Sequence, residues 1–222
     1  MTTKPSTRSV STVTRSSSGG QLRAVSSELN DRKRAEILHL AAREFAERGY
    51  HATTVRDLSR AIGLTQPMLY YHVGNKEEFL LSICESLLDW HIDAVAGLAD
   101  DSRPAPDRLR AFFVEELTKA AERPAEIAVY LRERQMLSPE LRRRLRPRQE
   151  QLEGVLRSIL RDGAAAGEFS YASLEVTADA MWAILNRASA SLERLSSRTT
   201  IADYAADLST LMLQGLVPRP SA

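Results

Sequence analysis

The sequence has little of what a secreted scaffold or a membrane protein requires. It contains one cysteine, Cys84, which excludes an internal disulfide framework and is typical of a reducing compartment. No apolar run approaches the roughly 18 residues of a membrane span, and no apolar segment near the start resembles a signal peptide. We therefore expect a cytoplasmic protein without a membrane partner.

The sequence also lacks the residue spacing of a catalytic or metal site. The four histidines, His39, His51, His72 and His91, are separated from one another and from Cys84 in patterns that match neither a zinc site nor an activated nucleophile. We predict no catalytic residue, no bound metal and no cofactor. The chain is therefore not expected to be an enzyme, and detectable turnover or bound zinc would reopen that question.

Charge is distributed unevenly along the chain. Residues 1–76 carry 12 Lys and Arg against 6 Asp and Glu, whereas the remainder carries 18 against 23. A basic first third followed by an acidic body is typical of a nucleic-acid-binding domain joined to a second domain. Four of the excess basic residues lie before residue 28, so a basic tail explains the asymmetry equally well on charge alone.

Apolar residues recur with helical spacing along most of the chain, and no stretch alternates with period two. The pattern predicts an all-α protein of about nine helices. Their expected ranges are 31–48, 55–62, 66–73, 76–98, 107–122, 124–134, 138–165, 173–195 and 200–216, and Pro147 is expected to break or kink the seventh.

Residues 1–29 are rich in Ser and Thr and contain four basic residues. Such a composition buries too little apolar surface to offset chain entropy, so we expect a disordered tail. A role as a basic arm that follows DNA remains an alternative.

Two short predicted helices, 55–62 and 66–73, are joined by a tight turn. Thr54 is a suitable N-cap with Asp57 in the capping-box position, and Gly63 suits the C-terminal turn. Thr65 is expected to cap the second helix, with Pro67 in its first turn.

The second short helix has one face for packing and another for contact. Leu69 and Val73 share the predicted inner face. The outward residues are Gln66, Pro67, Met68, Tyr70 and Tyr71. A recognition helix in the major groove of DNA is one use for such an exposed set.

The segment Gln66–Lys76 resembles the helix-turn-helix of TetR-family transcriptional regulators. The similarity lies in Leu69-Tyr70, the aromatic Tyr71, then His72, the apolar Val73, and Asn75-Lys76, although many members carry Phe where this chain has Val73. It extends over about residues 31–81. The resemblance implies a DNA-binding domain over 30–90 with its motif at 54–73, a ligand-binding and dimerisation domain over 91–217, and a tail at 218–222.

Ten residues of the motif are predicted to contact double-stranded DNA. Arg56 and Gln66 suit guanine and adenine edges, and Pro67 and Met68 suit thymine methyl groups. The resemblance implies phosphate contacts by Tyr70, Tyr71 and Lys76, and the helix N-terminus at Lys76 favours the same contact. The predicted set is completed by Thr54, Thr65 and His72.

The resemblance also implies a homodimer, paired through the last two long helices, and a pocket for a small-molecule effector. The candidate pocket residues are Trp90, Phe112, Phe113, Tyr130, Met136, Trp182 and Asn186. Ordinary core packing explains most of these apolar residues as well as ligand contact does. Their apolar and aromatic character suits a hydrophobic or acyl-type effector.

The expected function is a repressor that binds a palindromic operator as a dimer and is released by the effector. Two alternatives remain open: a DNA-binding regulator whose second domain binds a protein, and a ligand-dependent activator. The basic run at 141–148 permits nucleic-acid contact, but its spaced leucines and the acidic residues after it favour a solvated helix face.

Overall fold

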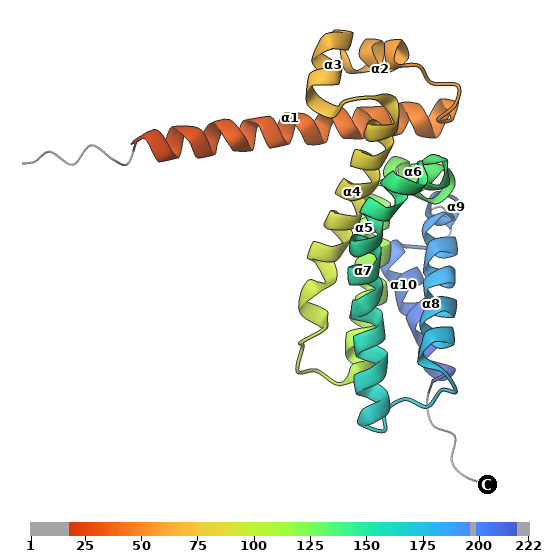
Figure 1. The fold of residues 1–222 in the computed structure, drawn as a ribbon. Helices are drawn as coiled ribbons and strands as arrows, with labels where there is room; N and C mark the ends of the chain where they lie inside the picture. Colours follow the sequence, from red (N-terminus) through yellow and green to blue (C-terminus); the bar gives the residue numbers. More distant parts are fainter. Residues whose placement is uncertain (1–17, 196–198, 217–222) are drawn as a thin grey trace, which may run out of the picture. The chain divides into compact units, whose positions relative to one another are not determined.

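The computed structural model describes residues 18–195 and 199–216, and this part of the chain is helical without a strand (Figure 1). The all-α prediction is therefore confirmed. The predicted basic segment up to residue 17 and the tail at 218–222 lie outside the described residues. None of the described helices is long and apolar enough to cross a membrane.

The described residues form ten α-helices and two short 3-10 turns. They are α1 (Ser18–Arg48), α2 (Val55–Ile62), α3 (Gln66–Val73), α4 (Lys76–Val95), η1 (Ala96–Leu98), α5 (Ala105–Glu122), α6 (Pro124–Glu133), η2 (Arg134–Met136), α7 (Pro139–Ala165), α8 (Leu174–Ser189), α9 (Leu192–Leu195) and α10 (Ile201–Gln214). The chain divides into two units, residues 1–36 and 37–222, and the second contains everything from the middle of α1 onward.

Helix α1 begins at Ser18 rather than at the predicted Asp31. The helix thus continues through residues 18–29, whose composition suggested a disordered tail. Once a helix is nucleated, each further residue adds one hydrogen bond, so a segment with weak propensity of its own can extend an existing helix. Asn30, which directly precedes the predicted start, lies inside α1.

The predicted helix over 173–195 is interrupted near Ala190. Helix α8 ends at Ser189, and the four-residue α9 follows at Leu192. The Ser191 hydroxyl donates a hydrogen bond to the Arg187 carbonyl at 2.9 Å. Serine side chains that compete for backbone carbonyls in this way favour turns over continued helix. By contrast, α7 continues through Pro147, because leucines on both sides of the proline are buried.

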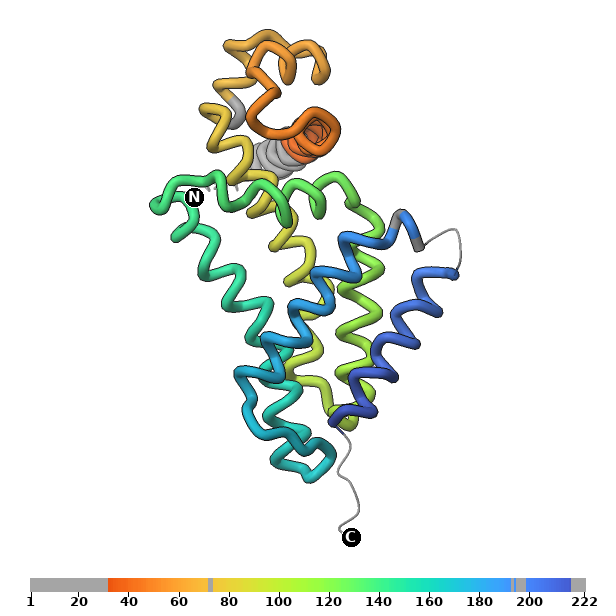
Figure 2. The backbone as a smooth tube through the Cα atoms, turned by 90° about the vertical axis from the view of Figure 1, so that its right-hand side faces the viewer, coloured from red at the N-terminus to blue at the C-terminus, as the bar shows by residue number. Residues whose placement is uncertain are grey.

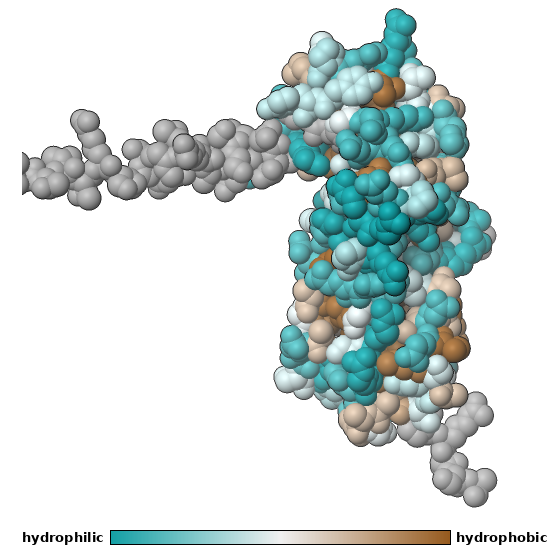
Figure 3. All heavy atoms as spheres, viewed as in Figure 1, coloured by the Kyte–Doolittle hydropathy of each residue, from teal (hydrophilic) through white to brown (hydrophobic). Residues whose placement is uncertain are grey.

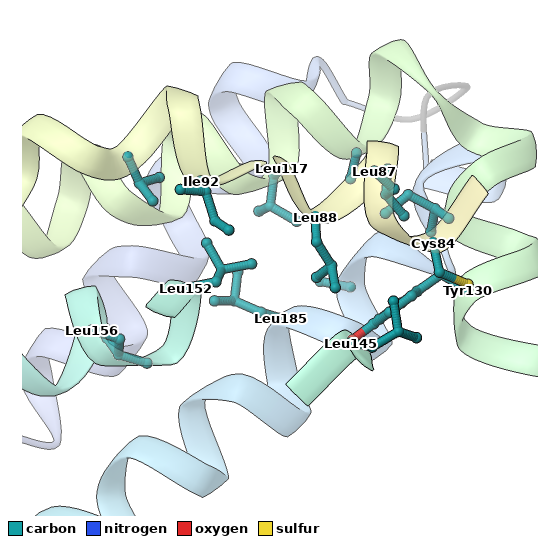
Figure 4. Packing of buried hydrophobic residues seen from close by; sticks show 14 of the residues in the cluster. Cys84, Leu87, Leu88, Ile92, Leu117, Tyr130, Leu145, Leu152, Leu156 and Leu185 are labelled. Carbon is teal, nitrogen blue, oxygen red and sulfur yellow. The ribbon is translucent and has the colours of Figure 1, made fainter. Parts of the chain in front are cut away.

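The core of the second unit lies among α4, α5, α7, α8 and α10. Helix α4 packs against α5, α6 and α7, while α5 also packs against α8 and α10 (Figure 2). Leucines fill the space between these helices, among them Leu88, Leu117 and Leu152 (Figure 4). The face of the helices seen in Figure 3 is mostly hydrophilic, with small separate hydrophobic patches.

Polar side chains also join the long helices, and several of them are buried. Arg108 of α5 contacts Asp162 of α7 at 2.9 Å and donates to the Leu98 carbonyl at 2.8 Å. His91 of α4 and Glu116 of α5, both buried, are 3.0 Å apart. The first contact joins α5 to α7 and to η1, and the second joins α4 to α5.

Candidate nucleic-acid interface and cavities

Helix α2 begins with the predicted capping box. The Asp57 backbone N–H donates to the Thr54 hydroxyl at 3.2 Å, and the Thr54 N–H donates to the Asp57 carboxylate at 3.0 Å. Hydrogen bonds from the Thr54 hydroxyl and backbone lower the pKa of Asp57. Gly63 ends the helix with φ +72°, in the left-handed region that favours glycine. The predicted caps of α2 are therefore confirmed.

Helices α2 and α3 are held by a few buried apolar side chains. Leu58 of α2 and Leu69 of α3 are fully buried, whereas Ala61, three residues after Leu58, is exposed. The side chain of Val73 lies outside the described residues. Eight-residue helices are unstable alone in water, so burial of these leucines against the rest of the domain maintains their orientation.

The outer face of α3 is exposed as the sequence predicts. Gln66, Pro67, Met68, Tyr70 and Tyr71 are all exposed, and Tyr71 is the most exposed of them at 86%. Thr65 is the N-cap of α3, but its side chain forms no capping hydrogen bond. The structure therefore brings an amide, apolar groups and two phenols together on one surface. The side chain of His72 lies outside the described residues.

Arg56 and Lys76 lie in different electrostatic environments. Arg56 is exposed on α2 and forms no ion pair with any residue that the structure describes. The Lys76 ammonium lies 4.3 Å from the centre of the Tyr50 ring and donates to the His51 carbonyl at 3.4 Å. Partial burial lowers the pKa of Lys76. Of the two, Arg56 extends more freely into solvent.

The start of α4 is already capped from within the chain. The Asn75 side-chain oxygen accepts hydrogen bonds from the backbone N–H groups of Glu77 at 2.9 Å and Glu78 at 3.0 Å. Asn75 is therefore the N-cap of α4. Because Asn75 occupies two of the N–H groups at this helix end, fewer of them remain free for a phosphate near Lys76.

Four contacts that the sequence did not predict join α1, the loop after it and the start of α4 to α6 and the segment that follows α6. His39 Nδ1 lies 2.8 Å from the Glu126 carboxylate, and Arg132 donates to the Ala46 carbonyl at 3.1 Å. His51 Nε2 lies 3.0 Å from Met136 Sδ. The Ser138 backbone N–H donates to the Glu77 carboxylate. Each pair is separated by more than 60 residues, so no local sequence pattern could reveal it.

Beside these contacts, α1, α6 and the α8–α9 turn line an open cleft of about 580 Å³, here called the α1–α6 cleft. Apolar residues dominate its lining, including Ala46, Ile127, Leu131 and Leu192. Its volume falls in the range of small-molecule sites. The cleft has the size and the lining to hold a hydrophobic compound.

The seven predicted pocket residues have several different surroundings in the structure. Phe112 and Phe113 are fully buried, and the Phe112 ring centre lies 6.2 Å from that of Trp182. Trp182 lines a separate cavity of about 240 Å³ between α7 and α8. The Trp90 ring is contacted by two cations of α5 and its C-terminal cap, Lys119 at 4.4 Å and Arg123 at 4.1 Å.

The other three predicted pocket residues have different surroundings. The Tyr130 hydroxyl accepts a hydrogen bond from Gln149 at 2.8 Å. Met136 is exposed and contacts His51, while Asn186 is half-buried on α8. Trp182, in the cavity between α7 and α8, is the one member of the seven among the lining residues of the cavities of about 580, 240 and 290 Å³ in the described part of the chain.

Two family models match the chain. Residues 37–83 match the model described as bacterial regulatory proteins, tetR family, and residues 102–190 match the tetracyclin repressor-like C-terminal domain. The first match covers the end of α1 through the start of α4, and the second covers α5 to α8. The HTH-type transcriptional repressor KstR2 of Mycobacterium tuberculosis is 32% identical over 146 residues, which is 65% of this chain and 72% of that protein.

Solved structures show the same arrangement of helices. The TetR family transcriptional regulator PfmR from Thermus thermophilus matches with a TM-score of 0.74 and 30% identity, over 80% of this chain and 97% of that one. The ketosteroid transcriptional regulator KstR2 of Mycobacterium tuberculosis matches with a TM-score of 0.72 and 26% identity, over 84% and 95%. The likeness therefore extends through both matched domains.

Proposed function

The chain belongs to the TetR family of bacterial regulatory proteins, and we propose that this DNA-binding transcriptional regulator represses its targets as a homodimer on a palindromic operator. The observation that carries the proposal is the exposed outer face of α3, where Tyr71 is 86% exposed while Leu69 is fully buried. A short helix presented in this way fits the major groove of DNA. Its place of action is the cytoplasm.

The proposed contacts divide into base readout and phosphate binding. Arg56 and Gln66 would read base edges, and Pro67 and Met68 would contact thymine methyl groups. Tyr70, Tyr71 and Lys76 would bind phosphates, which position the protein without reading sequence. The remaining members of the proposed surface are Thr54, Thr65 and His72. The unpaired, exposed state of Arg56 supports its assignment to a base.

Homodimerisation is proposed through α8 and α10. Both helices keep apolar side chains in solvent: Val176 on α8 is 69% exposed and Leu211 on α10 is 59% exposed. Ala180 and Ala183 continue the exposed side of α8. Burial of these faces against a second copy would remove apolar surface from water and set two α3 helices at the separation of two half-sites.

A hydrophobic small molecule is proposed to release the operator. The α1–α6 cleft supports this, because its walls come from α1 of the DNA-binding domain and from α6 of the body. A ligand there would act by binding one arrangement of these helices more tightly than another. Coupling is reciprocal, so operator DNA would weaken ligand binding by the same factor.

Selection from genomic DNA tests the proposed function. The purified full chain is incubated with sheared genomic DNA of its source organism at moderate salt, and the retained fragments are sequenced. Enrichment of a few palindromic sites is expected, and the neighbouring genes would indicate the effector. If the protein retains all fragments equally well, and added salt weakens the binding of all of them alike, sequence-specific binding is contradicted. If binding at these sites raises transcription of the neighbouring genes, the protein is an activator and not a repressor.

A further inference from the structure

A third cavity, of about 290 Å³, lies between α6, η2 and α7 and has a different chemistry from the α1–α6 cleft. Two arginines, two glutamines and two leucines line it: Leu131, Arg134, Gln135, Arg142, Leu145 and Gln149. The lining contains no acidic side chain among the residues that the structure describes. Guanidinium and amide groups together offer many hydrogen-bond donors and a net positive charge.

Arg134 is held in place by contacts that leave much of its guanidinium available. Its Nη1 donates to the Tyr130 and Leu131 carbonyls at 3.1 and 3.3 Å, and the group lies 4.8 Å from the centre of the Tyr130 ring. Figure 4 shows the Tyr130 ring extending toward Leu145, another residue of the cavity wall. Fixed in this way, Arg134 loses little freedom when its other N–H groups bind an acceptor.

Arg142 is distinguished from the arginines that follow it on α7. Arg144 and Arg148 pair with Glu85 of α4, and Arg146 pairs with Glu150. Within the described ranges Arg142 has no carboxylate partner, although it faces the same cavity as Arg134. Two carboxylates near this part of α7, Glu85 and Glu150, are thus paired with other arginines and not with Arg142.

We propose that this cavity is an oxyanion site, which binds the phosphate or carboxylate group of a small molecule and thereby changes the affinity of the protein for DNA. Arg134 and Arg142 would hold the anion between α6 and α7, and Gln135 and Gln149 would donate further hydrogen bonds. Arg–oxyanion pairs are charge-assisted and therefore among the stronger hydrogen bonds. Leu131 and Leu145 provide apolar surface beside the charge. Leu131 also lines the α1–α6 cleft.

The path to DNA runs through η2. This turn contains Arg134 and Gln135 of the cavity and also Met136, which contacts His51. Two residues later, the Ser138 N–H donates to Glu77 in the first turn of α4. An anion that holds η2 against α7 therefore biases the segment that contacts the DNA-binding helices.

Calorimetric titration of the full chain tests the site in the absence of DNA and is independent of the proposed repression. Inorganic phosphate and phenyl phosphate are titrated separately at constant ionic strength. Saturable binding is expected, and Arg142→Gln should weaken it roughly tenfold, as loss of a charge-assisted hydrogen bond does. Arg143→Gln is the matched control, because Arg143 is the next residue on α7, is exposed and does not line the cavity.

The two probes distinguish the source of the anion. Equal affinities would assign the site to a free oxyanion, whereas tighter binding of phenyl phosphate would assign it to the charged group of an organic molecule resting on Leu131 and Leu145. Absence of saturation with both probes would overturn the proposal. The proposal would also be overturned if Arg142→Gln and Arg143→Gln weakened phosphate binding equally. It would be overturned as well if Lys76→Gln alone abolished phosphate binding, because the anion would then bind at the proposed DNA-binding surface.

The coupling is measured on an enriched genomic site. Phenyl phosphate should change the DNA affinity of the wild-type chain and of Arg143→Gln, and should leave that of Arg142→Gln unchanged. If phenyl phosphate leaves the DNA affinity of all three proteins unchanged, the proposed coupling between the anion site and DNA binding is contradicted. The calorimetric evidence for the site itself would still stand.

Discussion

Large side chains are placed differently on α5, in the C-terminal body of the molecule, and on α3, in the DNA-binding domain. On α5, Phe112 and Phe113 are fully buried. On α3, Met68, Tyr70 and Tyr71 are exposed to 42%, 48% and 86%. Burial of large apolar groups stabilises a fold, whereas their exposure lowers solubility unless a partner covers them. The contrast assigns stability to the body and recognition to α3.

The two regions also differ in how their helices are held. Helices α2 and α3 have eight residues each and depend on caps and on single buried leucines. Helices α4, α5 and α7 have at least 18 residues and share a continuous core. Substitutions should therefore separate into those that unfold the body and those that alter DNA binding alone.

The largest effect is expected from Phe112→Ala in the body. Removal of a fully buried phenylalanine leaves a cavity and should lower the free energy of unfolding by about 3–5 kcal/mol. Urea denaturation followed by far-UV circular dichroism measures this change. A loss below about 1 kcal/mol would mean that the body core is far less tightly packed than the structure indicates.

The second largest effect is expected in the affinity for DNA and not in the stability of the fold. Arg56→Ala should weaken binding to the enriched operator by about 1–3 kcal/mol and relax the preference at one position. Affinity is measured on a panel of operators that differ by single base pairs. If the variant weakens binding equally to every sequence, Arg56 contacts a phosphate and not a base.

A smaller effect is expected from Asp57→Asn in the capping box of α2. Hydrogen bonds from Thr54 hold the folded-state pKa of Asp57 below its ordinary value of 3.8. Because the folded pKa is the lower one, this stabilisation is complete above the unfolded value and is lost as pH falls through the folded value.

The difference in unfolding free energy between wild type and Asp57→Asn should therefore shrink between about pH 7 and about pH 2. Denaturation at both pH values measures it. A difference of the same size at each pH would show that the carboxylate charge has no part in the cap.

The smallest effect is expected when the native protein is treated with a thiol reagent, because Cys84 is buried. Burial raises the pKa of its thiol to about 12, so the reactive thiolate is scarce at neutral pH. A thiol-specific chromophoric reagent should leave the native protein unlabelled at about pH 8 and should label one thiol in concentrated urea. Stoichiometric labelling of the native chain would indicate that α4 opens readily.

Local signals in the sequence were sufficient to predict where most helices begin and end. Thr54, Gly63 and Asn75 each act through neighbours within five residues, so their roles could be predicted without a structure. The start of α1 and the end of α8 could not be predicted in this way. The first has no helix-starting signal in its own sequence, and the second depends on hydroxyl competition near Ser191.

Sites formed by residues that lie far apart in the chain could not be predicted from the sequence. The exposed face of α3 followed from periodicity, because one buried leucine fixes the opposite side of a short helix. The contact between Met136 and His51 and the cavity shared by Arg134 and Arg142 depend on how α6, η2 and α7 pack. The run 141–148 was predicted as a solvated face, and Arg142, Arg143, Arg144 and Arg146 are indeed exposed.

The most direct test of the central claim is a paired measurement on Tyr71→Ala, made on one enriched operator. Tyr71 is 86% exposed, so its removal should change the free energy of unfolding by no more than about 0.5 kcal/mol. The affinity for the operator should nevertheless fall about fivefold or more, as loss of a phosphate hydrogen bond predicts. Unchanged affinity, or a loss of affinity that accompanies an equal loss of stability, would contradict the assignment of α3 as the recognition surface.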